Sequence, residues 1–182
     1  MPILSTEFVV VAPAEAVWDV VGRRFDRIGE WATAIAASQA VPARNDSCAT
    51  APQAGLAVVP AVPDAPVTGR ICRTGLRLLP PVTELLVAYD DATRTLTYQA
   101  SGLPAFVTIA ENTWTVTTVD QHRARVSLNA RFDTCGLLGL LGRWVILAQV
   151  GRTSRHLAED LRHFVEHGIP SPRKQRQLRR RR

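Results

Sequence analysis

Long hydrophobic runs and paired cysteines are both missing from this 182-residue sequence. No apolar run approaches the ~20 residues that a membrane-spanning helix needs, and the first eight residues lack the basic and apolar segments of a signal peptide. Cys48, Cys72 and Cys135 are far apart and form no Cys-x-x-Cys pair, which indicates free thiols. We therefore expect a cytoplasmic protein with no membrane span.

Acidic residues are absent from the end of the chain. Residues 173–182 hold seven of the 22 basic residues, and the rest of the chain has 15 basic and 16 acidic residues, a net charge of −1. Nearly all basic residues are arginine, which indicates a bacterial, GC-rich coding bias. The last segment has too little apolar content to offset the entropy of ordering. We expect a domain over 1–168 and a disordered basic tail over 169–182, which is simply solvated or contacts anionic lipid or nucleic acid weakly.

The order of the expected elements is that of an α+β domain, and the hydrophobic fraction of 46% is ample for one core. Residues 3–12 predict a strand, and two short helices, each with a tryptophan, follow it. The later strand candidates are 69–75, 82–90, 94–102, 107–120 and 122–134. An apolar stripe predicts a long helix from Leu137 to about His167, ended by Gly168 and Pro170. Residues 44–68, rich in proline and alanine, predict a long irregular loop.

The last strand candidate shows the clearest alternation of apolar and polar residues. Its apolar side consists of Ala124, Val126, Leu128, Ala130 and Phe132, and the residues between them are polar or charged. Alternation with a period of two predicts a strand with one wet face. Its other face is expected to line a core or a cavity.

Three stretches carry a resemblance to a known family. Residues 10–21 read V-x-A-P-A-E-x-V-W-D-x-V, followed by a Phe and a Trp; Glu84 precedes Asp90 by six residues; and an R-x-L-x-Y motif ends at Tyr98. This pattern resembles the START/SRPBCC superfamily, most closely its polyketide cyclase/dehydrase and lipid-transport family, over about residues 3–167. The resemblance implies a helix-grip fold, in which a curved antiparallel sheet wraps around a long C-terminal helix and two short helices follow the first strand. Trp18 and Trp31 would then wedge the short helices against the core.

The resemblance also implies a function, with alternatives. A hydrophobic small molecule, lipid or polyketide-like, would bind in an internal cavity between the sheet and the last helix. Alternatively, the same cavity would serve a polyketide cyclase or aromatase/dehydratase, with Glu84 or Tyr98 as acid or base. A third hypothesis is a nucleic-acid or membrane-surface adaptor that uses the tail. The residues do not decide between binding and catalysis.

Six residues are candidates for contact with such a ligand: Glu84, Tyr98, Phe106, Asn112, Trp114 and Leu128. By resemblance Glu84 points into the cavity, where it either meets the ligand or pairs with Arg70 or Arg73. Tyr98 either orients a ligand carbonyl or fills space, and Asn112 either bonds to a ligand or is satisfied by water. Phe106, at the cavity mouth by resemblance, is either a gate or part of the core.

No metal or cofactor is expected. His156, Asp160, His163 and His167 form one stripe of the last helix, but this stripe lies about a quarter-turn from the apolar face and is expected to meet solvent. No phosphate-cradling glycine loop or dinucleotide fingerprint is present. In relatives resembling plant hormone receptors a lysine anchors a ligand carboxylate, and Ala36 stands at that position here. We therefore expect no carboxylate anchor of that kind.

Overall fold

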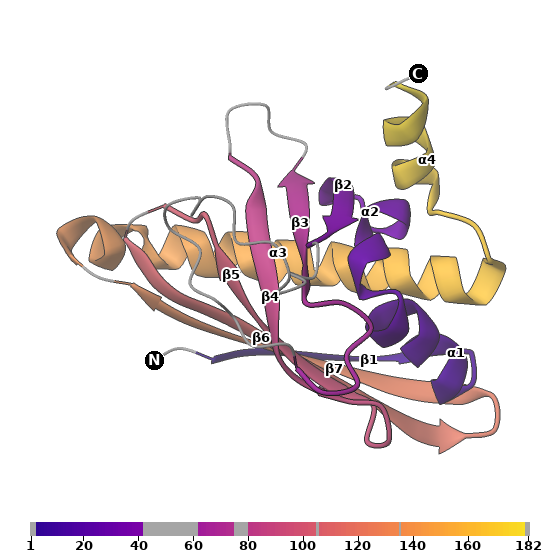
Figure 1. Cartoon of the computed structure of the whole chain (residues 1–182). Coiled ribbons are helices and arrows are strands. Elements are labelled where there is room, and N and C mark those ends of the chain that lie inside the picture. Colours follow the sequence, from indigo (N-terminus) through magenta and orange to yellow (C-terminus); the bar gives the residue numbers. More distant parts are fainter. Residues whose placement is uncertain (1–2, 42–61, 75–79, 105, 135, 181–182) are drawn as a thin grey trace, which may run out of the picture.

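A curved, seven-stranded antiparallel sheet dominates the structure (Figure 1). The computed structural model describes residues 3–41, 62–74, 80–104, 106–134 and 136–180, and their side chains except at 3 and 136–150. The strands lie in the order β1-β7-β6-β5-β4-β3-β2, so β1 and β2 form the two edges. Their bounds are β1 Ile3–Val10, β2 Ile35–Ala40, β3 Gly69–Thr74, β4 Val82–Asp90, β5 Thr95–Ser101, β6 Val107–Asp120 and β7 Arg123–Thr134.

Short helical segments after β1 and a long helix near the C-terminus complete the predicted layout. They are α1 (Ala14–Trp18), the π-helical η1 (Asp19–Arg23), the 3₁₀-helical η2 (Phe25–Arg27), α2 (Ile28–Trp31), α3 (Gly136–His167) and α4 (Pro172–Arg179). The α3 helix lies across the concave face of the sheet (Figure 1). No helix within the described ranges is both long and apolar enough to cross a membrane.

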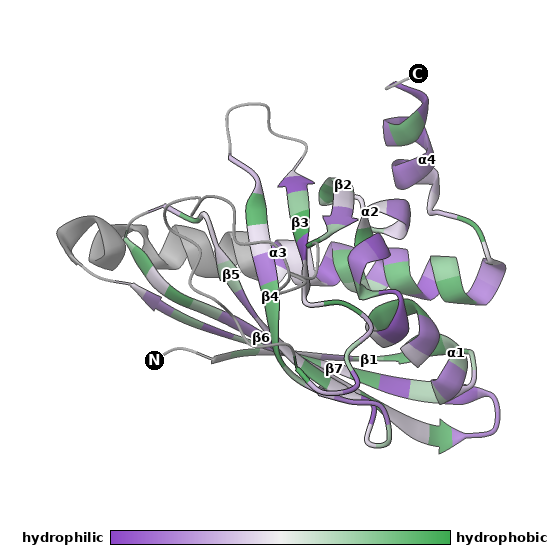
Figure 2. Cartoon of the chain, viewed as in Figure 1, coloured by the Kyte–Doolittle hydropathy of each residue, from purple (hydrophilic) through white to green (hydrophobic). Residues whose placement is uncertain are grey.

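The strand register confirms the alternation that the sequence predicts for residues 123–134. Directly paired residues of an antiparallel sheet point to the same side, and Val126 pairs with Phe8 of β1 and Val116 of β6. All three side chains are buried. The polar residues of β7 lie on the opposite, exposed face, and Figure 2 shows the resulting change of hydropathy from residue to residue along the strands. We call the face that bears Val126 the inner face.

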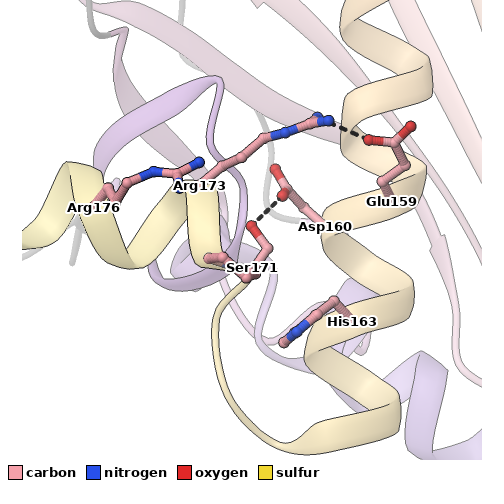
Figure 3. Close-up of a pocket in the computed structure, with 7 residues that line it drawn as sticks. Glu159, Asp160, His163, Ser171, Arg173 and Arg176 are labelled. Carbon is pink, nitrogen blue, oxygen red and sulfur yellow. Dashed lines mark hydrogen bonds and ion pairs between the residues drawn. The ribbon is translucent and has the colours of Figure 1, made fainter.

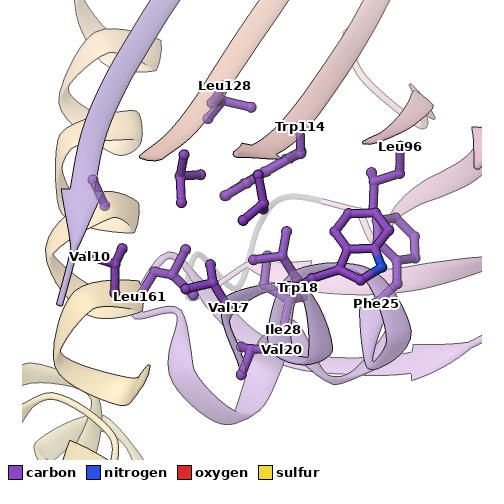
Figure 4. Close-up of a cluster of buried hydrophobic side chains, with 14 of the residues drawn as sticks. Val10, Val17, Trp18, Val20, Phe25, Ile28, Leu96, Trp114, Leu128 and Leu161 are labelled. Carbon is purple, nitrogen blue, oxygen red and sulfur yellow. The ribbon is translucent and has the colours of Figure 1, made fainter. Parts of the chain in front are cut away.

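The hydrophobic core lies between the inner face and the short helical segments (Figure 4). Trp18 has no exposed surface, and Trp31 is 3% exposed, so both occupy the core as predicted. The Trp18 ring lies directly against the backbone of Gly22, where a Cβ atom would stand 2.5 Å from the ring atom Cε2. Glycine is therefore needed there because of close packing.

The second half of α3 packs on the edge strand β1 and ends where the sequence predicts. Leu161 of α3 is fully buried in the core. Next to Leu161 on the helix, Arg162 Nε donates a 2.8 Å hydrogen bond to the carbonyl oxygen of Val9 in β1. Gly168 ends the helix with φ at +71°, a left-handed conformation that favours glycine, and its N–H bonds to the Phe164 carbonyl oxygen.

The segment after residue 168 differs from the prediction of a disordered tail. Ser171 caps the N-terminus of α4 by accepting a hydrogen bond from the Lys174 backbone N–H. Lys174 itself has no exposed surface, and its Nζ donates to the Ile35 carbonyl oxygen (2.6 Å) and to Gln177 Oε1 (3.0 Å). A lysine can be buried in this way because its aliphatic stem packs as apolar surface once its ammonium group has hydrogen-bond partners. Of the predicted loop over 44–68, residues 44–61 lie outside the described residues, as do Cys48 and Cys135.

Candidate functional site

Five of the six candidate ligand residues lie on the inner face. Tyr98 of β5 pairs directly with Asn112 of β6. Trp114 of β6 pairs directly with Leu128 of β7. Glu84 of β4 pairs with Ala100, two positions along β5 from Tyr98 and therefore on the same side. The register thus brings together side chains from four neighbouring strands.

The inner face is sealed at the end covered by α1 and becomes more exposed toward the opposite end. On β6, Trp114 is 1% exposed, whereas Asn112, the next inward residue, is half-buried. The same change separates Leu96 from Ala100 on β5. Further half-buried inward side chains at this open end are Leu4, Thr6, Glu84 and Phe132. The candidate residues straddle this transition from a packed core to a more open wall.

Glu84 forms a buried ion pair with Arg70, one of the two partners that the sequence suggests. Arg70 Nε lies 2.5 Å from Glu84 Oε2, and the two side chains are 4% and 13% exposed. A second guanidinium nitrogen of Arg70 donates to the Phe25 carbonyl oxygen at 2.7 Å. Burial disfavours the charge of Arg70, yet attraction to Glu84 leaves the pKa of the guanidinium above its ordinary value. The pair therefore adds no net charge to the interior of the protein.

Tyr98 lies beside this ion pair. Its ring centroid is 5.4 Å from that of Phe25, and the Arg70 guanidinium lies 5.2 Å from the centre of the Tyr98 ring. Burial, assisted by the charge of Glu84, raises the pKa of the Tyr98 hydroxyl well above its usual range. The hydroxyl consequently keeps its proton at physiological pH. Burial likewise raises the pKa of the neighbouring Cys72 thiol to about 12, so this cysteine is not a ready nucleophile.

Trp114 carries a polar atom that the described residues leave unsatisfied. Its indole Nε1 is buried and has no hydrogen-bond partner. The Trp114 indole favours ionisation of the neighbouring Tyr98 hydroxyl, although no hydrogen bond of regular geometry joins the two groups. A buried N–H without an acceptor costs about 1–3 kcal/mol. Trp114 and Tyr98 thus form an incompletely paired polar site on the inner face.

The remaining candidates are placed differently. Leu128 is 5% exposed and belongs to the hydrophobic core cluster. Phe106 is half-buried in the connection between β5 and β6, where no strand pairing places it on the inner face. Arg70, which sequence reasoning considered only as a partner for Glu84, is a central residue of the site. Residues 69–74 also contain Arg73, so the local sequence does not single out Arg70.

A separate pocket of about 290 Å³ lies between α3 and α4. Figure 3 shows Asp160 pointing toward Ser171, whose hydroxyl donates to Asp160 Oδ1, and Arg173 pairing with Glu159 at 2.8 Å. The sequence pattern predicts that this stripe of α3 meets solvent. Asp160 is only 2% exposed, so this part of the stripe instead anchors α4. Among the residues whose structure is described, no group of three potential metal ligands is present. Nothing in this arrangement supports a contact of the tail with lipid or nucleic acid.

Comparison with known proteins identifies the family. The sequence profile described as "Polyketide cyclase / dehydrase and lipid transport" matches residues 1–167. The chain belongs to this family. A comparison with curated proteins finds no match.

Solved structures confirm the predicted fold. The Zhui aromatase/cyclase from Streptomyces sp. R1128 has 16% sequence identity and a TM-score of 0.67, with 93% of this chain and 96% of that chain covered. A START superfamily protein from Mycobacterium smegmatis has 14% identity and a TM-score of 0.63, with 90% and 97% covered. The di-domain aromatase/cyclase BexL has 17% identity and a TM-score of 0.66, with 91% and 47% covered. At these identities the likeness shows the START-type helix-grip fold alone.

Proposed function

We propose that this polyketide cyclase/dehydrase and lipid-transport family member encloses a hydrophobic small molecule between the inner face and α3. The observation that carries the proposal is the change in burial along the inner face. Apolar side chains seal one end, whereas at the other end Leu4, Thr6, Asn112 and Phe132 stay half-buried under the helix and only the small Ala110 and Ala130 are buried. Binding sites of this class are mostly apolar with a few convergent polar groups, and Glu84, Tyr98, Asn112 and Trp114 supply such groups.

The test uses one substitution at two inward positions of β7. Ala130 is 2% exposed but lies outside the hydrophobic core cluster, whereas Ala124 is fully buried inside it. We expect Ala130→Phe to fold normally and to lose binding of an environment-sensitive apolar dye, because the ring occupies the ligand's place. Ala124→Phe should instead lower the free energy of unfolding by about 1–3 kcal/mol through overpacking.

Thermal unfolding reports stability, and dye fluorescence reports binding. A wild-type protein that binds no apolar dye contradicts the proposal. So does an Ala130→Phe variant that binds the dye as tightly as the wild type does. The comparison with Ala124→Phe shows whether the two ends of β7 differ in packing, as the burial of the inner face indicates.

The arrangement around Tyr98 supports a second candidate function, a cyclase or aromatase/dehydratase reaction in the same cavity. A protonated hydroxyl beside the Arg70–Glu84 pair can donate a proton to a bound carbonyl oxygen or stabilise charge on it. Two of the similar structures are named aromatase/cyclases. Tyr98→Phe should then abolish turnover of a poly-β-ketone substrate and leave its binding within a few-fold of wild type. Equal turnover by the variant and the wild type would exclude this role for the hydroxyl.

A further inference from the structure

The polar groups of the inner face follow a diagonal across three strands. Trp114 on β6, Tyr98 on β5 and Glu84 on β4 are successive diagonal neighbours in the sheet register. Such neighbours are about 7–8 Å apart at their Cα atoms, within reach of long and aromatic side chains. The charge of Glu84 raises the pKa of the Tyr98 hydroxyl between them, whereas the Trp114 indole lowers it. The diagonal therefore runs from an indole donor through a hydroxyl to a carboxylate acceptor.

Each end of the diagonal has hydrogen-bonding capacity to spare. Among the residues that the structure describes, the buried Trp114 indole N–H has no acceptor. At Glu84, the Arg70 guanidinium and the Cys72 thiol both contact Oε2, and no donor from the described part of the chain bonds to Oε1. A bound group that accepts a hydrogen bond from the indole and donates one toward the carboxylate would use the hydrogen-bonding capacity at both ends. A hydroxyl group has both capabilities, whereas a carboxylate can only accept.

The charges of the inner face argue against an anionic ligand. On the described part of this face, the charged side chains are Arg70 and Glu84, and they neutralise each other. Arg70 is further occupied by the Phe25 carbonyl oxygen, and its guanidinium lies 3.9 Å from the centre of the Phe25 ring. A buried anion without a dedicated cation is strongly disfavoured. A ligand carboxylate would also approach the negative charge of Glu84.

From the proposed ligand-binding function and this arrangement, we propose that the site selects a neutral apolar molecule that bears a hydroxyl group. The hydroxyl oxygen accepts the Trp114 N–H, and its hydrogen bonds toward Tyr98 and Glu84. The apolar remainder of the molecule extends along the small inward residues Ala110 and Ala130, which are buried but lie outside the core cluster. Carboxylates of the same shape are rejected.

Three probes with the same ring system test this selectivity: naphthalene, 2-naphthol and 2-naphthoate. Their affinities are measured at pH 7 by displacement of the apolar dye and by calorimetry. We expect 2-naphthol to bind about threefold to tenfold more tightly than naphthalene, the value of one net hydrogen bond. We expect 2-naphthoate to bind at least tenfold more weakly than 2-naphthol.

Two tryptophan variants locate the effect. Trp114→Phe keeps an aromatic ring but removes the indole N–H, so the ratio of 2-naphthol to naphthalene affinity should fall toward one. Trp31→Phe is the matched control, because its indole N–H is also buried and unpartnered but belongs to α2 rather than to the sheet. It should leave the ratio unchanged. The ratio is insensitive to a general loss of stability, which affects both probes alike.

The outcomes separate this inference from the proposed function. Equal affinity for 2-naphthol and 2-naphthoate, or for 2-naphthol and naphthalene, overturns the inference and leaves the enclosed site standing. The same holds if the dye binds and none of the three probes displaces it, or if Trp114→Phe and Trp31→Phe change the ratio equally. If neither the dye nor any probe binds, the proposed function fails, and the inference fails with it.

Discussion

The ammonium group of Lys174 donates a 2.6 Å hydrogen bond to the carbonyl oxygen of Ile35, which lies 139 residues earlier in the chain. Lys174 is the only lysine in the sequence, and none of its surface is exposed. The C-terminal helix α4 is therefore attached to the start of β2 by a specific polar contact.

Replacing this lysine tests how much the attachment contributes to stability. Lys174→Ala should lower the free energy of unfolding by about 1–3 kcal/mol, because it leaves a buried carbonyl oxygen without a donor. Urea unfolding at constant pH measures the change. Arg179→Ala, an exposed position on the same helix, should change the free energy by less than about 0.5 kcal/mol. Equal effects of the two variants would show that α4 does not depend on this contact.

Asp91 makes the stability depend on pH in the acid range. Hydrogen bonds from Arg23 and from the Trp18 indole hold the pKa of the Asp91 carboxyl well below its usual range. A lowered folded-state pKa adds stability above the unfolded-state pKa of about 3.9. That contribution is lost as the pH falls below this value. Asp91→Asn should therefore unfold with a shallower pH dependence below about pH 4 than wild type, measured by thermal unfolding at a series of pH values. Parallel pH profiles for the two proteins would contradict this assignment.

Removing one partner of the Arg70–Glu84 pair should strongly lower the free energy of unfolding. Arg70→Met leaves Glu84 buried without its cation, and we expect a loss of about 3–5 kcal/mol in the free energy of unfolding. Adding Glu84→Gln should restore part of this loss, because the uncompensated charge is gone. The exposed pair of Arg123 and Asp120 serves as control, and Arg123→Met should cost no more than about 1 kcal/mol. A double variant as unstable as Arg70→Met alone would argue against a charge effect.

Gly22 and Gly151 offer a matched test of packing in helical segments. A Cβ atom at Gly22 would collide with the buried Trp18 ring at 2.5 Å, whereas one at Gly151 would stand 3.9 Å from a Leu4 methyl carbon. Gly22→Ala should lower the free energy of unfolding by about 1–3 kcal/mol. Gly151→Ala should leave it unchanged or raise it by up to about 1 kcal/mol through helix propensity. Chemical denaturation measures both, and similar values would show that Trp18 moves aside.

Local patterns in the sequence predict the sheet and the long helix well. The alternation of residues 123–134 identifies the inward side chains of β7, and Gly168 ends α3 where the prediction placed its end. These features depend on side-chain period and backbone conformation, which neighbouring residues determine. The site is harder to predict, because which arginine pairs with Glu84 depends on the register of β3 against β4. No spacing along the chain reveals that register.

The C-terminal segment shows how composition can mislead. Its charge predicts disorder, but Ser171 and Pro172 form a standard helix start, with a capping hydroxyl followed by proline at the first position. That signal was present in the sequence. The burial of Lys174 was not, because it depends on a carbonyl group of β2 that the fold brings close.

The two edge strands of the sheet have backbone groups occupied by the C-terminal helices. Beside β1, Arg162 bonds to the Val9 carbonyl oxygen and Glu166 accepts the Val11 N–H, and at β2 Lys174 bonds to the Ile35 carbonyl oxygen. Open sheet edges are templates for pairing with strands of other molecules. A chain shortened before α4 should therefore uncover the Ile35 carbonyl oxygen and self-associate more readily at high concentration, even under conditions in which each molecule retains its fold.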